Sequence, residues 1–209
     1  MTRFRHQDKI VLIMETYNTT EIINVLREKN ISVFSAIDFA RLFKIGSRDT
    51  VYKKLDRLRK KGMIARVIKG KYFFTLNPPD DFILANFLYQ PSYVSLESAM
   101  SFHRIITGFA YTITSVTPLK TKVYLISDKE YGYTHLSPKW FWGYEKKEAF
   151  LMAGPEKAVF DYLYLAFKGL RSAMIDEFDL STIDRVMLKD YLHRIPDQRF
   201  LRFTQRLKL

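Results

Sequence analysis

Apolar residues in the first 45 positions recur at helical spacing. Three segments carry them at intervals of three and four residues, which predicts amphipathic helices at residues 8–16, 20–29 and 35–43. The third segment begins with a capping-box pattern in which Asp38 replaces the usual Glu or Gln three residues after Ser35. Its apolar residues predict a buried element: Ile37, Phe39, Ala40, Leu42 and Phe43.

A further helix is predicted between Ser47, a favourable N-cap, and Gly62, which ends it. At 100° per residue its aliphatic side chains, Val51, Leu55 and Leu58, form one stripe that packs on the preceding helices. After Gly62, two β-prone runs at 63–68 and 71–74 flank a tight turn, a pattern typical of a hairpin. Two helices joined by a short turn and followed by a hairpin predict a winged helix-turn-helix, in which the second helix of the pair enters the DNA major groove.

The remainder of the chain has a mixed pattern. Prolines and acids follow Asn77 and predict a boundary between residues 1–77 and residues 78–209. Beyond it we expect helices at 96–105, 155–169, 182–194 and 197–207, and strands at 111–116, 122–127 and 132–136. The predicted class is α+β: an N-terminal winged helix-turn-helix, then a mixed α/β domain with a small, mainly antiparallel sheet and a basic helical tail.

Charge is concentrated in the first part. Residues 1–77 carry a net +10 and residues 78–209 a net +2, which together make the formal +12 of the 209-residue chain. Residues 41–71 alone hold 12 Lys or Arg and 2 Asp. A Lys-rich helix is often only a solvated face, but a basic helix between a helical turn and a basic hairpin favours binding to a polyanion.

We therefore predict that double-stranded DNA is the partner and that no cofactor is used. Arg48 and Lys53 are expected to read bases, whereas the lysines at the end of the helix and in the hairpin are expected to contact phosphates. The predicted DNA-binding residues are Ser47, Arg48, Asp49, Thr50, Lys53, Lys54, Arg57, Lys60, Lys61, Arg66, Lys69 and Lys71.

Composition excludes several other classes of protein. The chain has no cysteine, so disulfides, thiolate catalysis and Cys-ligated zinc are excluded. A hydrophobic content of 47% and an aromatic content of 15% predict a folded protein. The apolar run 10–14 is too short for a signal peptide, and no run is long enough to span a bilayer, so we expect a cytoplasmic protein with no membrane partner.

Catalytic motifs are lacking. The histidines of the second part have no metal-ligand spacing. Its ionisable candidates for catalysis are scattered along the chain: Glu97, His103, Asp128, His135, Glu156 and Asp161. There is no phosphate-binding glycine loop and no nucleophile elbow. We expect a non-enzymatic protein with no metal and no catalytic residue; the alternative is a metal-dependent nuclease that uses Asp128 and Glu130.

Two features of the second part leave alternatives open. The aromatic run 140–144 contains Trp140 and Trp142, which are either core residues or anchors for a protein partner, and less favourably a stacking surface for bases. The tail 181–209 holds seven Lys or Arg and three acids. It suits a supplementary phosphate contact or a docking surface, and its last fifteen residues are expected to be dispensable for folding.

Several segments together resemble a known family. Residues 34–43, 47–62 and the hairpin up to Phe74 precede PSYVSLESAMSFH at 91–103 and AGPEKAVFD at 153–161. This series resembles the AbiE-type antitoxins, predicted regulators of viral defence in type IV toxin–antitoxin systems. The resemblance runs from about residue 20 to 170. It departs at Arg104-Ile105, where the family often has Gly after the His, and it ends before Ser172. It implies repression of a promoter, often that of its own operon, and a cognate toxin resembling a nucleotidyltransferase.

Overall fold

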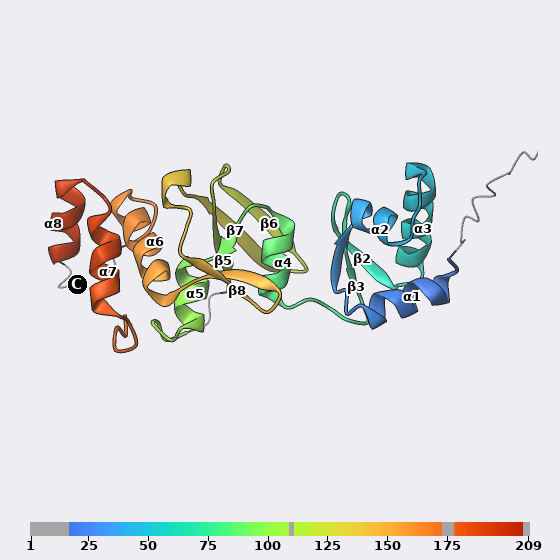
Figure 1. The fold of residues 1–209 in the computed structure, drawn as a ribbon, viewed down its shortest axis with the longest axis horizontal. Coiled ribbons are helices and arrows are strands. Elements are labelled where there is room, and N and C mark those ends of the chain that lie inside the picture. Colours follow the sequence, from blue (N-terminus) through green and yellow to red (C-terminus); the bar gives the residue numbers. More distant parts are fainter. Residues whose placement is uncertain (1–16, 109–110, 173–177, 207–209) are drawn as a thin grey trace, which may run out of the picture. The chain divides into compact units, whose positions relative to one another are not determined.

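Residues 17–108, 111–172 and 178–206 are described in the computed structural model (Figure 1). The helix predicted at 8–16 lies outside these residues. The chain combines helices with two sheets, so it belongs to the α+β class, and it divides after Pro79 into two units. That division falls two residues beyond the predicted boundary.

The helices of the first unit are α1 (Thr19–Glu28), α2 (Ala36–Leu42) and α3 (Arg48–Lys60). Helices α2 and α3 begin where the capping residues predict, and α1 begins one residue before its predicted range. The backbone N–H of Asp38 donates to Ser35 Oγ at 3.1 Å, and the N–H of Ser35 donates to the Asp38 carboxylate at 2.9 Å, which completes the predicted capping box. Ser47 Oγ accepts from the N–H of Thr50 at 3.4 Å.

A three-stranded antiparallel sheet completes this unit, with strand order β1-β3-β2. Strands β2 (Ile64–Ile68) and β3 (Lys71–Phe74) form the predicted hairpin. Strand β1 (Val33–Ser35) was not predicted, because three residues immediately before a helix cap are too few to show alternation. Figure 1 shows the three helices gathered beside this sheet, and their buried faces and the strands share one core. Ile37 was expected in that core but is 65% exposed. The face of α2 that packs into the core is the one that carries Ala36 and Phe39, and Ile37 lies on another face of the helix.

The second unit contains a six-stranded mixed sheet, larger than the small sheet predicted. Its order is β6-β7-β5-β4-β9-β8; β4 pairs with β9 and β5 with β7 in parallel, and the other three pairs are antiparallel. The predicted strands are present as β5 (Ile113–Thr117), β6 (Lys122–Ile126) and β7 (Lys129–His135). Three strands were missed because they are two to four residues long: β4 (Tyr93–Val94), β8 (Tyr144–Lys147) and β9 (Phe150–Ala153).

Helices complete the second unit. They are α4 (Asp81–Leu88), which was not predicted, α5 (Leu96–Phe102), a short 3-10 turn η1 (Pro138–Trp140), α6 (Pro155–Phe167), α7 (Arg185–His193) and α8 (Gln198–Arg206). Helix α5 ends three residues before the prediction, at a turn where Arg104 has a φ of 61°. Helix α6 contacts β9, and α7 and α8 pack on α6, as their succession in Figure 1 shows.

The tail is part of this core. The Phe200 side chain is completely buried, with its ring centroid 5.3 Å from that of Phe167 and 6.4 Å from that of Tyr164. The expectation that the last fifteen residues are dispensable for folding is therefore wrong, because their removal would uncover apolar surface of α6. No helix in the described part of the chain is long and apolar enough to cross a membrane.

Candidate nucleic-acid interface

The outward face of α3 carries the cations that are most available to a ligand. Val51, Leu55 and Leu58 are buried against α1, α2 and the sheet, so the opposite side of the helix faces solvent. Lys53 and Arg57 are exposed there, and Arg48 is exposed in the first turn, nearer the buried stripe; none of the three forms an ion pair with a described residue. The Arg48 guanidinium lies 5.7 Å from the centroid of the Tyr52 ring, which restricts its side chain without neutralising it.

Other predicted contacts on this helix already have partners. Lys60 and Arg59 pair with Asp56 at 2.9 and 2.8 Å, and hydrogen bonds from Arg59 and then Lys60 lower the pKa of that carboxyl group. The Lys54 ammonium donates to the carbonyl of Tyr17 at 2.8 Å, and the structure therefore uses it to hold the start of α1. Lys61 donates to Thr19 Oγ1 at 3.2 Å.

The hairpin presents an exposed lysine at its tip. Lys69 lies at its tip beside Gly70, whose φ of +77° is a left-handed conformation that favours glycine. Lys71 is half-buried, and burial lowers its pKa, opposed by the nearby charge of Asp38. Arg66 is exposed but donates from Nε to the carbonyl of Ile68 at 3.4 Å.

A groove between α2 and α3, which the sequence pattern did not indicate, adjoins the N-terminal end of α3. Its volume is about 690 Å³, and Arg41, Lys44 and Arg48 line it together with apolar residues that include Ile37. Ser47, Asp49 and Thr50 stand at the same end of α3. A carboxylate such as Asp49 repels phosphate but accepts a hydrogen bond from the amino group of cytosine. This end of α3 therefore combines cations, an acceptor and exposed apolar surface.

The structure does not bring the catalytic candidates of the second unit together. His103 Nε2 lies 2.9 Å from the carbonyl of Ala153, and His135 Nδ1 donates to the carbonyl of Leu119 at 2.8 Å. Glu97 pairs with Arg171 at 2.8 Å, and Glu156 accepts from the N–H of Asp184 at 2.9 Å. Asp128 is exposed in a turn, and Glu130 accepts from Thr112 at 3.3 Å. Among the described residues no three His, Asp or Glu side chains are placed to hold a metal ion.

Asp161 instead belongs to a buried polar network. Its carboxylate forms an ion pair with Lys157, one helical turn earlier, and both side chains are at most 1% exposed. It also accepts hydrogen bonds from Tyr93 at 2.9 Å and Ser95 at 2.8 Å. Burial raises the pKa of Asp161 and lowers that of Lys157, and the opposite charge of each partner counteracts both shifts. The network joins segment 91–103 to segment 153–161, the two segments that carry the more specific part of the family resemblance.

The two tryptophans lie beside this network. The Lys157 ammonium lies 4.8 Å from the ring centroids of Trp142 and Phe160, a cation–π arrangement. Trp140 is 7% exposed and packs on Phe160. Tyr191 packs edge-on against Trp142, and the Arg194 guanidinium lies 4.6 Å from the centroid of the Trp142 ring. Of the three alternatives for the aromatic run, the core position holds for Trp140, whereas Trp142 packs against Tyr191 of α7 and stays partly exposed. Binding of a partner by either ring stays a prediction.

Comparison with protein-family models gave no match to this chain, and comparison with curated proteins gave none either. The resemblance to AbiE-type antitoxins therefore rests on the sequence segments themselves. The residues that the structure presents most openly to a ligand are those on the outer face of α3 and at the tip of the hairpin.

Proposed function

We propose that the chain is a sequence-specific DNA-binding transcriptional regulator. In this proposal the first unit is a winged helix-turn-helix: α2 and α3 form the helix pair, α3 enters the major groove, and the β2–β3 hairpin is the wing. The observation that carries the proposal is the set of exposed α3 cations that form no ion pair with a described residue: Lys53 and Arg57 on the face opposite the buried stripe, and Arg48 in the first turn beside the groove. A helix of these dimensions fits the major groove of B-DNA, and its N-terminal residues reach the base edges.

The neighbouring groups divide between reading bases and holding the backbone. Arg48 is suited to guanine, because a guanidinium can donate two hydrogen bonds to O6 and N7. The exposed Ile37 at the groove offers an apolar surface suited to a thymine methyl group. Lys69 on the wing is suited to phosphate. Lys60 is a weaker phosphate contact than the sequence predicts, because Asp56 competes for its charge.

Fluorescence anisotropy with a labelled duplex from the region upstream of the chain's own gene tests this proposal. Arg48→Ala should weaken binding to the preferred site by about 1–3 kcal/mol and leave binding to an unrelated duplex much less changed. Lys69→Ala should weaken binding to both duplexes and reduce the slope of log K against log salt by about 0.9. Lys29→Ala, at the exposed end of α1, is the control for loss of one positive charge.

Equal losses from Lys29→Ala and Arg48→Ala would mean that only net charge attracts the DNA. Unchanged affinity after both Arg48→Ala and Lys53→Ala would refute α3 as the recognition helix.

We further propose that this regulator is the antitoxin of a type IV toxin–antitoxin system and represses its own operon. The support is the resemblance at segments 91–103 and 153–161, together with the buried network that joins them. A cytoplasmic, non-enzymatic protein that meets operator DNA and a nucleotidyltransferase-like toxin accounts for both units. Coexpression with the adjacent open reading frame, scored by growth, tests it. Loss of toxicity in the presence of this chain is expected, and an adjacent gene that is harmless alone would contradict it.

A further inference from the structure

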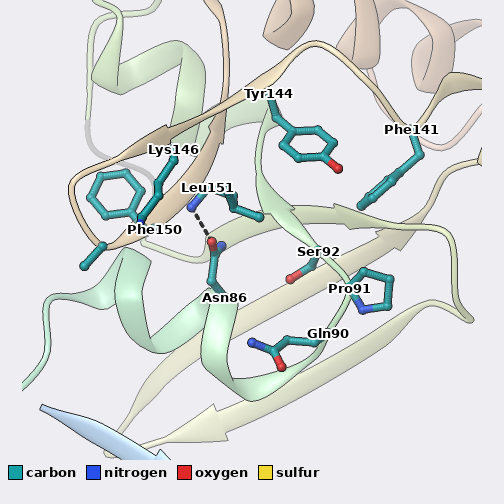
Figure 2. A pocket seen from close by; sticks show the side chains of 10 residues that line it. Asn86, Gln90, Pro91, Ser92, Phe141, Tyr144, Lys146, Phe150 and Leu151 are labelled. Carbon is teal, nitrogen blue, oxygen red and sulfur yellow. Dashed lines mark hydrogen bonds between the residues drawn. The ribbon is translucent and has the colours of Figure 1, made fainter. Parts of the chain in front are cut away.

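A pocket of about 330 Å³ lies in the second unit where α4 and the residues after it meet strands β8 and β9. Figure 2 shows its lining: Asn86, from α4, and Gln90 on one side, the rings of Phe141 and Tyr144 on the other, and Lys146 and Phe150 from the β8–β9 hairpin. The volume is at the lower end of the range for small-molecule sites, so it suits a ligand with one ring system and one substituent. None of these residues belongs to the proposed DNA interface.

Asn86 provides an unused hydrogen-bond donor in this pocket. Its side chain is 9% exposed, and its Oδ1 accepts from the backbone N–H of Leu151. That contact fixes the orientation of the amide, because an N–H needs an oxygen as its acceptor. Asn86 Nδ2 is left buried with no partner among the described residues. Less than 1 Å² of Nδ2 is accessible, so a ligand reaches it only after a small shift of the amide. An unpaired buried donor is costly, and a ligand that supplies an acceptor after that shift removes this cost.

The opposite wall is aromatic and rigid. The rings of Phe141 and Tyr144 lie 5.2 Å apart, and both pack against the buried ring of Tyr93, at 5.0 and 4.6 Å. Tyr93 is in turn held by its hydrogen bond to Asp161. A wall of this kind offers a planar ligand a surface that need not rearrange on binding.

The rim determines the charge of the ligand. Lys146 is exposed and forms no ion pair with a described residue, whereas its neighbour Lys147 is paired with Glu145 at 3.0 Å. The amide of Gln90 is exposed at the edge of the pocket and supplies a further donor and acceptor. No carboxylate lines the pocket. An anionic substituent is therefore favoured at the rim and a cationic one is disfavoured.

We propose that this pocket binds a nucleoside monophosphate, with the base against the aromatic wall, a carbonyl or ring nitrogen of the base accepting from Asn86, and the phosphate at Lys146. Amide side chains read the edges of bases and aromatic rings stack on their faces, so the two walls match the two surfaces of one ligand class. The pocket gives the second unit a small-molecule site that does not depend on the proposed DNA binding.

Isothermal titration calorimetry of the full chain at 150 mM salt tests the proposal. The four common ribonucleoside 5′-monophosphates, their nucleosides and inorganic phosphate are the probes. At least one monophosphate is expected to bind saturably, one to one, with a Kd below about 1 mM. Asn86→Asp keeps an acceptor for Leu151 but removes the donor. It should weaken the binding of that monophosphate and of its nucleoside by about tenfold, the effect of one lost hydrogen bond.

Two surface variants separate the base from the phosphate. Lys146→Met should weaken the affinity for the monophosphate by about fivefold and leave the affinity for the nucleoside unchanged. The control Lys147→Met should change neither affinity. Because both lysines are at the surface, these variants remain informative if Asn86→Asp fails to fold. The proposal is overturned if no monophosphate binds at ligand concentrations several times higher than the expected Kd limit of about 1 mM. It is also overturned if inorganic phosphate binds equally well, or if Lys147→Met has the effect of Lys146→Met.

Discussion

Removing either charge of the Lys157–Asp161 pair should destabilise the second unit strongly. In Lys157→Met the stem is retained and the ammonium is lost, so the Asp161 carboxylate, fully buried, keeps only the hydrogen bonds from Tyr93 and Ser95. In Asp161→Asn the ammonium of Lys157 is left among aromatic rings with no anion. With both groups at most 1% exposed, solvent cannot compensate, and each single variant should lose about 3–5 kcal/mol of unfolding free energy.

The double variant distinguishes the pair from its surroundings. Lys157→Met/Asp161→Asn leaves no buried charge, and the carbonyl of the new amide can still accept from Tyr93 and Ser95. It should therefore cost much less than the sum of the single variants, with a coupling energy of about 2 kcal/mol or more. Both tryptophans of the chain, Trp140 and Trp142, lie beside this network, so urea unfolding followed by Trp fluorescence reports on this unit alone.

A pH series adds an independent check. Burial raises the pKa of Asp161, and loss of the ammonium in Lys157→Met raises it further. The folded state then holds a proton that the unfolded state releases near pH 4, so the stability of this variant falls as pH rises. Its deficit relative to the wild type should be smaller at pH 5 than at pH 8. Single-variant losses below about 1 kcal/mol, or additive losses in the double variant, would refute the reasoning.

Three further outcomes are expected for the second unit. Gly143→Ala should be destabilising by circular-dichroism melting, because φ is +71° there and a Cβ would lie 2.9 Å from Cδ of the buried Lys157 stem; normal stability would contradict this packing. Burial raises the pKa of Tyr93, Tyr131 and Tyr133, so the folded state keeps protons that the unfolded state loses, and stability should fall above pH 10 by up to about 1.4 kcal/mol per pH unit for each tyrosine. Burial lowers the pKa of Lys157, which makes stability rise with pH, but only up to pH 10.5, the ordinary value for lysine. Urea unfolding at pH 8.5 and at pH 11 measures whether the loss of stability from the tyrosines occurs. Phe200→Ala should cost about 3–5 kcal/mol, whereas the exposed control Arg202→Ala should change stability by less than about 0.5 kcal/mol, and equal effects would show that the tail is not part of the core.

Features that depend on a few neighbouring residues could be read from the chain alone. The caps at Ser35 and Ser47, the buried stripe of α3 and the β2–β3 hairpin were all predicted correctly. Each depends on hydrogen bonds and side-chain spacing within one helical turn or one tight turn, so the signal is local. The concentration of positive charge in residues 41–71 was likewise visible from composition.

The tertiary structure decided which of those charges are available and which side chains are buried. Lys54 is a predicted DNA contact, but its ammonium donates to the carbonyl of Tyr17, 37 residues away in the chain, a bond that no local pattern indicates. Strands β4, β8 and β9 exist because partners from distant segments supply their hydrogen bonds, and none is long enough to show alternation by itself. Asp161 was a catalytic candidate by residue type, but it is buried and accepts hydrogen bonds from Tyr93 and Ser95, more than 60 positions earlier in the chain. The free amide of Asn86 is visible only once β9 has taken its oxygen, since the partners of a buried polar group are chosen by packing rather than by neighbours in the chain.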